Sequence, residues 1–83
     1  MQHTSNGDIA RILRGVAEYL TMESANPFRI RAYGRAAEAI ESLEEDIFLI
    51  YKNGGEKALE AVPGVGMAIR DHVIEIFRTV KLG

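Results

Sequence analysis

The chain has 83 residues, a formal net charge of -2 and no cysteine. This length suffices for one small domain and excludes an enzyme with two lobes and a deep cleft. Without cysteine, neither disulfides nor thiolate metal ligands exist, and His3 and His72 alone make no side-chain zinc site. No apolar run reaches the roughly 18 residues of a membrane span, and residues 1–4 lack signal-peptide features. We expect a soluble, intracellular protein without a membrane partner, which would be cytoplasmic if it is bacterial.

Hydrophobic residues recur at helical spacing over residues 7–22, which predicts a first helix. Either Ser5 or Asn6 is the expected N-cap. On the polar face of this helix Arg14 and Glu18 are four residues apart and can pair. This pairing favours a solvated face over a DNA contact.

A second helix is predicted over residues 27–43. Asn26 is its expected cap, and Pro27 suits the first helical position, where its missing N–H costs nothing. The predicted apolar stripe of this helix consists of Phe28, Ala32, Ala36, Ile40 and Leu43, with Tyr33 and Ala37 beside it. Gly34 costs about 1 kcal/mol relative to alanine inside a helix. It either lets another backbone or a ligand approach closely or is merely tolerated.

Three shorter helices are predicted over residues 46–52, 56–61 and 67–80. Acidic residues at 44–46 suit the positive start of the first of them, and Asn-Gly-Gly at 53–55 is expected to end it. No strand-like alternation occurs along the chain. The sequence therefore predicts an all-α domain of four to five short helices around one core.

Residues 62–66, Val-Pro-Gly-Val-Gly, join the last two predicted helices. Gly64 and Gly66 let the backbone turn sharply, while Pro63 cannot continue the preceding helix. The N–H groups of these glycines and of the next helix's first residues have no intrahelical partner, so they can point at an anion such as phosphate. An ordinary turn between packed helices fits these five residues equally well. If the hairpin binds phosphate, valine at Gly64 or Gly66 is expected to abolish DNA binding while helical content survives.

Charge is unevenly distributed around the second predicted helix. Residues 27–37 carry Arg29, Arg31 and Arg35 and no acid, whereas residues 38–46 carry five acids and no base. A net charge of -2 argues against a dedicated nucleic-acid binder. The arginine-rich segment nevertheless offers planar guanidinium groups, which bind phosphate well.

Two sequence blocks are distinctive in combination: Asn-Pro-Phe-Arg-Ile-Arg-Ala-Tyr-Gly-Arg-Ala-Ala at residues 26–37 and Val-Pro-Gly-Val-Gly-Met-Ala-Ile at residues 62–69. In this order they resemble the N-terminal domain of family X DNA polymerases, the DNA polymerase β-like group, over essentially the whole chain. The resemblance implies a helix-hairpin-helix domain that binds gapped DNA, or single-stranded DNA with a 5′-phosphate. Several members also remove 5′-deoxyribose phosphate through a lysine Schiff base. The family continues into C-terminal polymerase domains after the position of Gly83, so the resemblance implies either a fragment of a DNA-directed DNA polymerase or a short stand-alone relative.

The resemblance and the arginine cluster together assign the site residues. The residues expected to bind DNA or phosphate are Arg29, Arg31, Tyr33, Arg35, Gly64, Val65, Gly66, Ala68, Arg70 and His72. The resemblance also implies a monovalent cation, Na⁺ or K⁺, held by the main-chain oxygens of Glu60, Val62 and Val65, and no other cofactor. Ala68 stands where lyase-type members often have a lysine, and His72 stands in place of the Schiff-base lysine.

Three functions remain open at this stage. The favoured one is a DNA-binding module for repair synthesis, without a catalytic residue of its own. The second is a 5′-deoxyribose-phosphate lyase that uses another amine, for which Lys81 is the candidate, with His72 as a general base. The third is a helical interaction domain that has lost DNA binding, which the net charge and Ala68 would suit. The chain has no clustered aspartates for a two-metal site, so any nucleotidyl transfer would need other domains.

Overall fold

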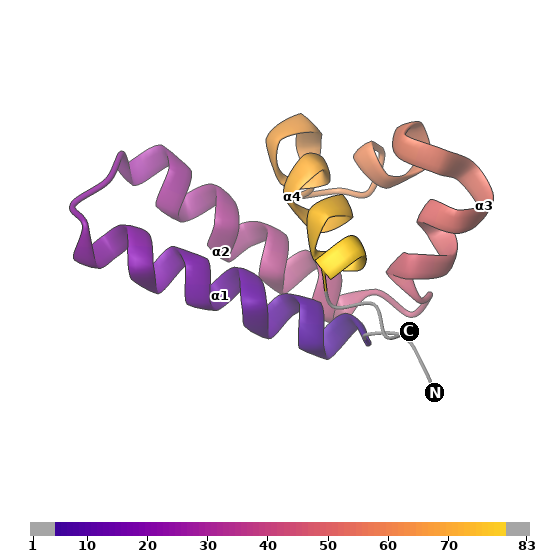
Figure 1. The fold of residues 1–83 in the computed structure, drawn as a ribbon, viewed down its shortest axis with the longest axis horizontal. Coiled ribbons are helices and arrows are strands. Elements are labelled where there is room, and N and C mark those ends of the chain that lie inside the picture. The colour runs from indigo at the N-terminus through magenta and orange to yellow at the C-terminus, as the bar shows by residue number, and fades with distance from the viewer. Residues whose placement is uncertain (1–4, 80–83) are drawn as a thin grey trace.

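The computed structural model describes residues 5–79, which form four α-helices and no strand. The helices are α1 (Asn6–Met22), α2 (Pro27–Ser42), α3 (Ile47–Glu60) and α4 (Gly66–Thr79). In Figure 1, α1 and α2 form a long antiparallel pair, and α4 lies between α2 and α3. The all-α prediction is confirmed. No helix within residues 5–79 has both the length and the apolar character needed to cross a membrane.

Side-chain caps begin the first three helices, as the sequence predicts for two of them. Ser5 Oγ accepts from the N–H of Asp8 at 3.1 Å, and the Asp8 carboxylate accepts from the Ser5 N–H at 3.4 Å. Asn26 Oδ1 accepts from the Phe28 N–H at 2.8 Å, and the Asp46 side chain caps α3 in the same way. Each cap satisfies an N–H group that the helix itself leaves without a partner.

Asn6 has a different task from the capping role considered for it. Its side-chain nitrogen donates to the carbonyl of Glu45 at 2.7 Å, and its side-chain oxygen accepts from the N–H of Ile47 at 2.8 Å. Both partners lie in or next to the α2–α3 connection. Asn6 therefore ties the start of α1 to the start of α3, which are 41 residues apart in the chain.

The Asp8 carboxylate gives this capping arrangement a pH dependence. Its pKa is lowered from the ordinary value, first by the hydrogen bond from Arg11 and then by those from Ser5. A lowered folded-state pKa means that the stabilisation is present above the unfolded-state pKa, near 3.9, and is lost as pH falls through the folded value. We expect Asp8→Asn to lower the melting temperature at neutral pH and to match the unmodified protein near pH 2.

Thermal unfolding followed by circular dichroism at several pH values measures this effect. Glu44→Gln is the control, because the Glu44 carboxylate forms no ion pair with another residue of the described part of the chain. A difference between Asp8→Asn and the unmodified protein that is the same at both ends of the pH range would contradict the assignment.

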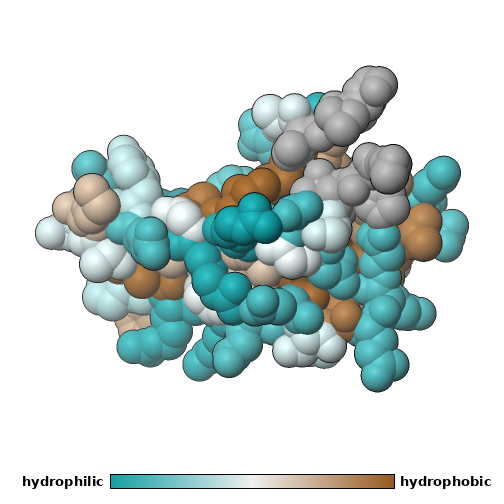
Figure 2. Space-filling view, turned by 90° about the horizontal axis from the view of Figure 1, so that it is seen from below, coloured by the Kyte–Doolittle hydropathy of each residue, from teal (hydrophilic) through white to brown (hydrophobic). Residues whose placement is uncertain are grey.

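The core draws on all four helices. Every buried residue within residues 5–79 is hydrophobic, and the largest fully buried side chains are those of Ile9, Leu13, Ile40, Ile47, Leu59 and Val73. Phe77 of α4 packs its ring against Phe48 and Tyr51 of α3, with centroids 5.2 and 5.4 Å apart. On the face shown in Figure 2, hydrophobic residues appear in small patches between hydrophilic ones. The ring contacts fix how α4 lies on α3, and so how the hairpin between them is presented.

The helices predicted over residues 46–52 and 56–61 are both present, as the two segments of α3 on either side of a kink. The backbone leaves helical conformation only at Gly55, with φ 75° and ψ -163°. This left-handed φ favours glycine. Gly54 is required for a different reason, because a Cβ there would lie 2.4 Å from the Ala58 Cβ. The break predicted at residues 53–55 is therefore confirmed at Gly55, where the chain bends between the two segments.

Two further predictions about contacts were wrong. Phe28 is 75 % exposed, because a row of residues spaced by four winds around a helix of 3.6 residues per turn. The rest of the predicted α2 stripe is confirmed, because Tyr33, Ala36, Ala37 and Ile40 are buried and Leu43 packs against the core. Arg14 pairs with Glu41 of α2 at 2.6 Å and not with Glu18, because the antiparallel α2 brings its acid within reach. This hydrogen bond raises the pKa of Arg14 above its ordinary value.

Candidate nucleic-acid interface

The segment between α3 and α4 forms the predicted tight hairpin. The N–H of Val65 donates to the carbonyl of Val62 at 3.0 Å. Pro63 and Gly64 occupy the middle of this turn, and Gly64 has φ 91°. Proline followed by a residue with positive φ is the signature of a type II turn. Gly66, with φ 67°, then begins α4.

The hairpin packs directly against α2. A Cβ at Gly64 would lie 2.9 Å from the Ala39 Cβ and 3.5 Å from the Arg35 carbonyl oxygen. A Cβ at Gly66 would meet no atom within 4 Å. Val65 is buried, with 3 % of its surface exposed. Gly64 and the Val65 side chain thus serve the packing of the hairpin, whereas Gly66 faces open space.

Tyr33 of α2 and His72 of α4 meet although they are 39 residues apart in the chain. The Tyr33 hydroxyl lies 2.8 Å from His72 Nδ1, and the two rings meet edge to face at 5.4 Å. Tyr33 is buried and His72 is half-buried. When Nδ1 carries no proton, Tyr33 donates to it, and Nε2–H remains to donate to another acceptor such as a phosphate oxygen.

The three predicted arginines do not share one face of α2. Arg31 and Arg35 are four residues apart and lie on one side, whereas Arg29 lies one turn before Tyr33 on the other. All three are exposed, and none forms an ion pair with another residue among those described. The Arg31 guanidinium lies 6.0 Å from the centroid of the Phe28 ring. Their charges are therefore free to meet an outside anion in two separate places.

Arg70 occupies a different environment from these arginines. Only 17 % of its side chain is exposed, although the apolar pattern of the helix places it mainly outside. It contacts the carboxylates of Glu60 at 3.0 Å and Asp71 at 2.7 Å. The hydrogen bond with Asp71 is the main cause that raises the pKa of Arg70. Arg70 therefore joins the end of α3 to the start of α4 across the hairpin.

The remaining predicted residues complete this surface. Ala68 is exposed one turn before His72, so it lies on the same face of α4. Gly34 is exposed, and a Cβ there would meet no atom within 4 Å, so nothing packs against it. Lys81 and the end of the helix predicted over residues 67–80 lie outside the described residues.

Sequence reasoning missed the hollow between α2 and the hairpin. Its volume is ≈ 280 Å³, and it is lined by Arg35, Glu38, Ala39, Ser42, Pro63 and Gly64. The small residues Ala36 and Ala39 of α2 indicate that another backbone comes near. They do not indicate which segment of the chain supplies that backbone. The hollow places Arg35 directly beside the hairpin.

These features define a class of protein: a small all-α domain built around two helices joined by a glycine turn. The chain belongs to the helix-hairpin-helix domain family, whose model matches residues 4–82. Helix-hairpin-helix domains generally bind DNA. No curated protein matches the chain closely enough to count as a relative.

Proposed function

We propose that this domain is the DNA-binding domain of a family X DNA polymerase-like protein and grips gapped or 5′-phosphorylated DNA. The observation that carries the proposal is the placement of the hairpin. It is packed on α2 at Gly64, open at Gly66, and next to Arg35, whose side chain is exposed and shares the adjoining hollow with Glu38. Backbone N–H groups and free positive charge therefore lie together at the positive start of α4.

The backbone of the DNA would be held at the hairpin. The first N–H groups of α4 have no partner within their helix, and Gly66 has no side chain to keep a phosphate away. Arg35, and Arg31 one turn before it, add guanidinium groups on the same side of α2. These groups recognise phosphate, so they position DNA without reading its sequence.

The 5′-phosphate would be held at a second place, on the other side of α2. Arg29 supplies charge there, and His72, held by the hydroxyl of Tyr33, supplies an N–H donor. Ala68, one turn before His72, adds no charge of its own to that side of α4, and the exposed Glu75 lies one turn after His72.

The implied Na⁺ or K⁺ fits the turn. The carbonyl of Val62 uses one lone pair for the Val65 N–H, and a carbonyl oxygen has two, so it can also bind a cation. The main-chain oxygens of Glu60 and Val65 flank it in the chain and would complete the set. A bound cation would supply a positive charge next to a DNA phosphate.

Fluorescence anisotropy with a gapped duplex tests this function. We expect weak binding. The logarithm of the binding constant should fall with the logarithm of the salt concentration at a slope of about -3, because three or four phosphates are bound. A 5′-phosphate at the gap should give tighter binding than a 5′-hydroxyl. Absence of binding at low salt would reject the function, and equal affinity for the two ends would reject the recognition of the 5′-phosphate.

Schiff-base lyase activity is expected to be absent. An imidazole forms no stable imine, and the His72 ring is engaged by Tyr33. Lys52 and Lys57 are exposed on α3, before the hairpin, and neither contacts the His72 ring. Borohydride trapping on DNA with an incised abasic site should give no covalent adduct under conditions where anisotropy shows binding. An adduct that disappears in Lys81→Ala would instead make the domain a lyase that uses that amine.

A further inference from the structure

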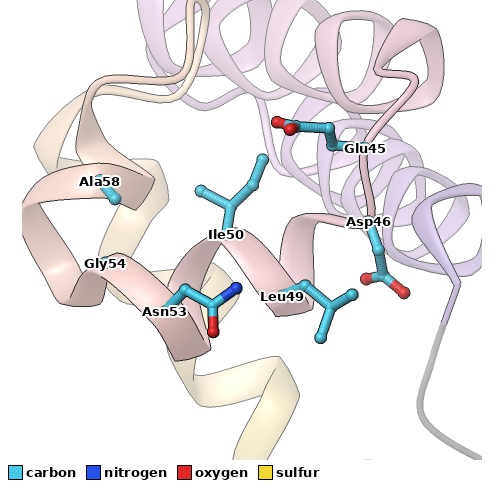
Figure 3. A pocket seen from close by; sticks show the side chains of 7 residues that line it. All are labelled: Glu45, Asp46, Leu49, Ile50, Asn53, Gly54 and Ala58. Carbon is cyan, nitrogen blue, oxygen red and sulfur yellow. The ribbon is translucent and has the colours of Figure 1, made fainter.

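A second hollow lies between the α2–α3 connection and the bend of α3 (Figure 3). Its volume of ≈ 530 Å³ is within the range of about 300–1,000 Å³ that is usual for ligand pockets. Nothing in the proposed DNA-binding surface uses it. It also lies next to the acidic end of α2, whereas Arg29 and Arg31 lie towards the other end.

The walls of this hollow are apolar. Leu49 is 46 % exposed, and its side chain projects from the first half of α3 beside that of Ile50. Ala58, on the second half of α3, lines the hollow across the bend. A single exposed leucine needs no explanation. Here, however, apolar side chains from both halves of a bent helix line one concave surface.

The shape of the hollow is built into the fold. The bend depends on the positive φ of Gly55 and on the missing side chain of Gly54, which lets Ala58 come close. The hydrogen bonds from Asn6 to Glu45 and from Ile47 to Asn6 hold the opposite edge in place. A partner would therefore meet a preformed surface and would need to order little of it on binding.

The rim of the hollow is polar and negatively charged. Glu45 is exposed and forms no ion pair with another residue of the described range. Asp46 adds a second carboxylate, which also caps α3. Asn53 lies further along α3, and its side-chain amide makes no hydrogen bond with another residue within residues 5–79. It can therefore pair with the backbone of a partner. Such a rim repels DNA and attracts lysine and arginine.

We infer that this hollow is a docking site for a segment of another polypeptide that carries a leucine- or methionine-sized anchor beside basic residues. The anchor would lie against Leu49 and Ile50, and the basic residues would meet Glu45 and Asp46. A second copy of the chain would offer Phe28 and its neighbouring arginines from the far end of α2. That arrangement is head-to-tail, so it would give a ring or a filament and not a symmetric dimer.

The test uses a short synthetic peptide of alternating lysine and leucine and amide-resolved NMR. We expect the shifted amides to fall within residues 45–58. Leu49→Gln and Glu45→Lys should each weaken binding by about tenfold, which corresponds to about 1.4 kcal/mol. Met22→Gln is the matched control, because Met22 is also an exposed hydrophobic residue but lies elsewhere, on α1, and should leave peptide affinity unchanged. Circular dichroism establishes that each variant is folded.

Four results would overturn the inference. They are equal binding of a peptide in which glutamate replaces lysine, shifts that do not centre on residues 45–58, shifts of these amides by DNA, and self-association that Leu49→Gln abolishes. The last result would assign the hollow to a second copy of the chain. Leu49→Gln should keep full DNA affinity, so the outcome is independent of the proposed DNA-binding function.

Discussion

Gly64→Val is expected to lower the free energy of unfolding by about 3 kcal/mol. The residue has φ 91°, a conformation in which a β-branched side chain is strained. In addition, its Cβ would overlap the Ala39 Cβ at 2.9 Å, so the hairpin and α2 would have to move apart. Urea denaturation followed by circular dichroism measures the change. The sequence alone led us to expect that helical content survives valine at this position. With Ala39 against Gly64, we instead expect Gly64→Val to destabilise the fold.

Gly66→Val is the matched comparison. Its φ of 67° is also strained for valine, but a Cβ there meets open space, so we expect a decrease of only about 1–2 kcal/mol. A folded Gly66→Val protein should nevertheless fail to bind DNA, because the new side chain occupies the space in front of the first N–H groups of α4. If Gly66→Val binds DNA with unchanged affinity, the hairpin is only a turn. Equal stability of the two valine variants would contradict the role given to Ala39.

The combined variant Arg29→Ala, Arg31→Ala and Arg35→Ala is expected to weaken DNA binding on the order of 100-fold at low salt. The slope of binding against salt should become shallower by about 1 for each phosphate that is no longer bound, so most of the slope of about -3 should disappear. All three side chains are exposed and lack ion pairs within residues 5–79. Their removal should therefore leave the unfolding free energy almost unchanged.

Arg11→Ala with Arg14→Ala is the control for this prediction, because it also removes positive charge. Arg11 already contacts Asp8 at 2.7 Å, and Arg14 contacts Glu41 at 2.6 Å. Both lie on α1, away from the hairpin. Anisotropy titrations at several salt concentrations should show an almost unchanged slope for this pair. A triple variant that binds as the control does would mean that the arginines of α2 do not bind the DNA.

Local sequence alone determined the helices and the turn. Asn26 followed by Pro27 begins α2, and the observed hydrogen bond from the Phe28 N–H to Asn26 is made within three residues. The same is true of the hairpin, where the bond from Val65 to Val62 spans one turn. Such features depend on backbone conformation and on neighbours in the chain, so a single sequence is enough to predict them.

Only the tertiary structure decided which distant side chains meet. Tyr33 and His72 were both candidates, but their meeting depends on α4 lying against α2. The same crossing places Ala39 against Gly64 and so makes one glycine of the hairpin a packing residue and leaves the other open. Helical spacing gives the angle of each side chain around its own helix and says nothing about which helix lies opposite.

The pairing of charges was decided in the same way. The sequence predicted that Arg14 pairs with Glu18, but it pairs with Glu41 of α2. The sequence also placed Arg70 mainly outside, but Arg70 is held between two carboxylates at the hairpin. Arg29, Arg31 and Arg35 keep their charge free for an outside anion. An exposed ion pair is worth so little that sequence spacing cannot choose among partners, and the packing of the apolar faces brings the acids within reach.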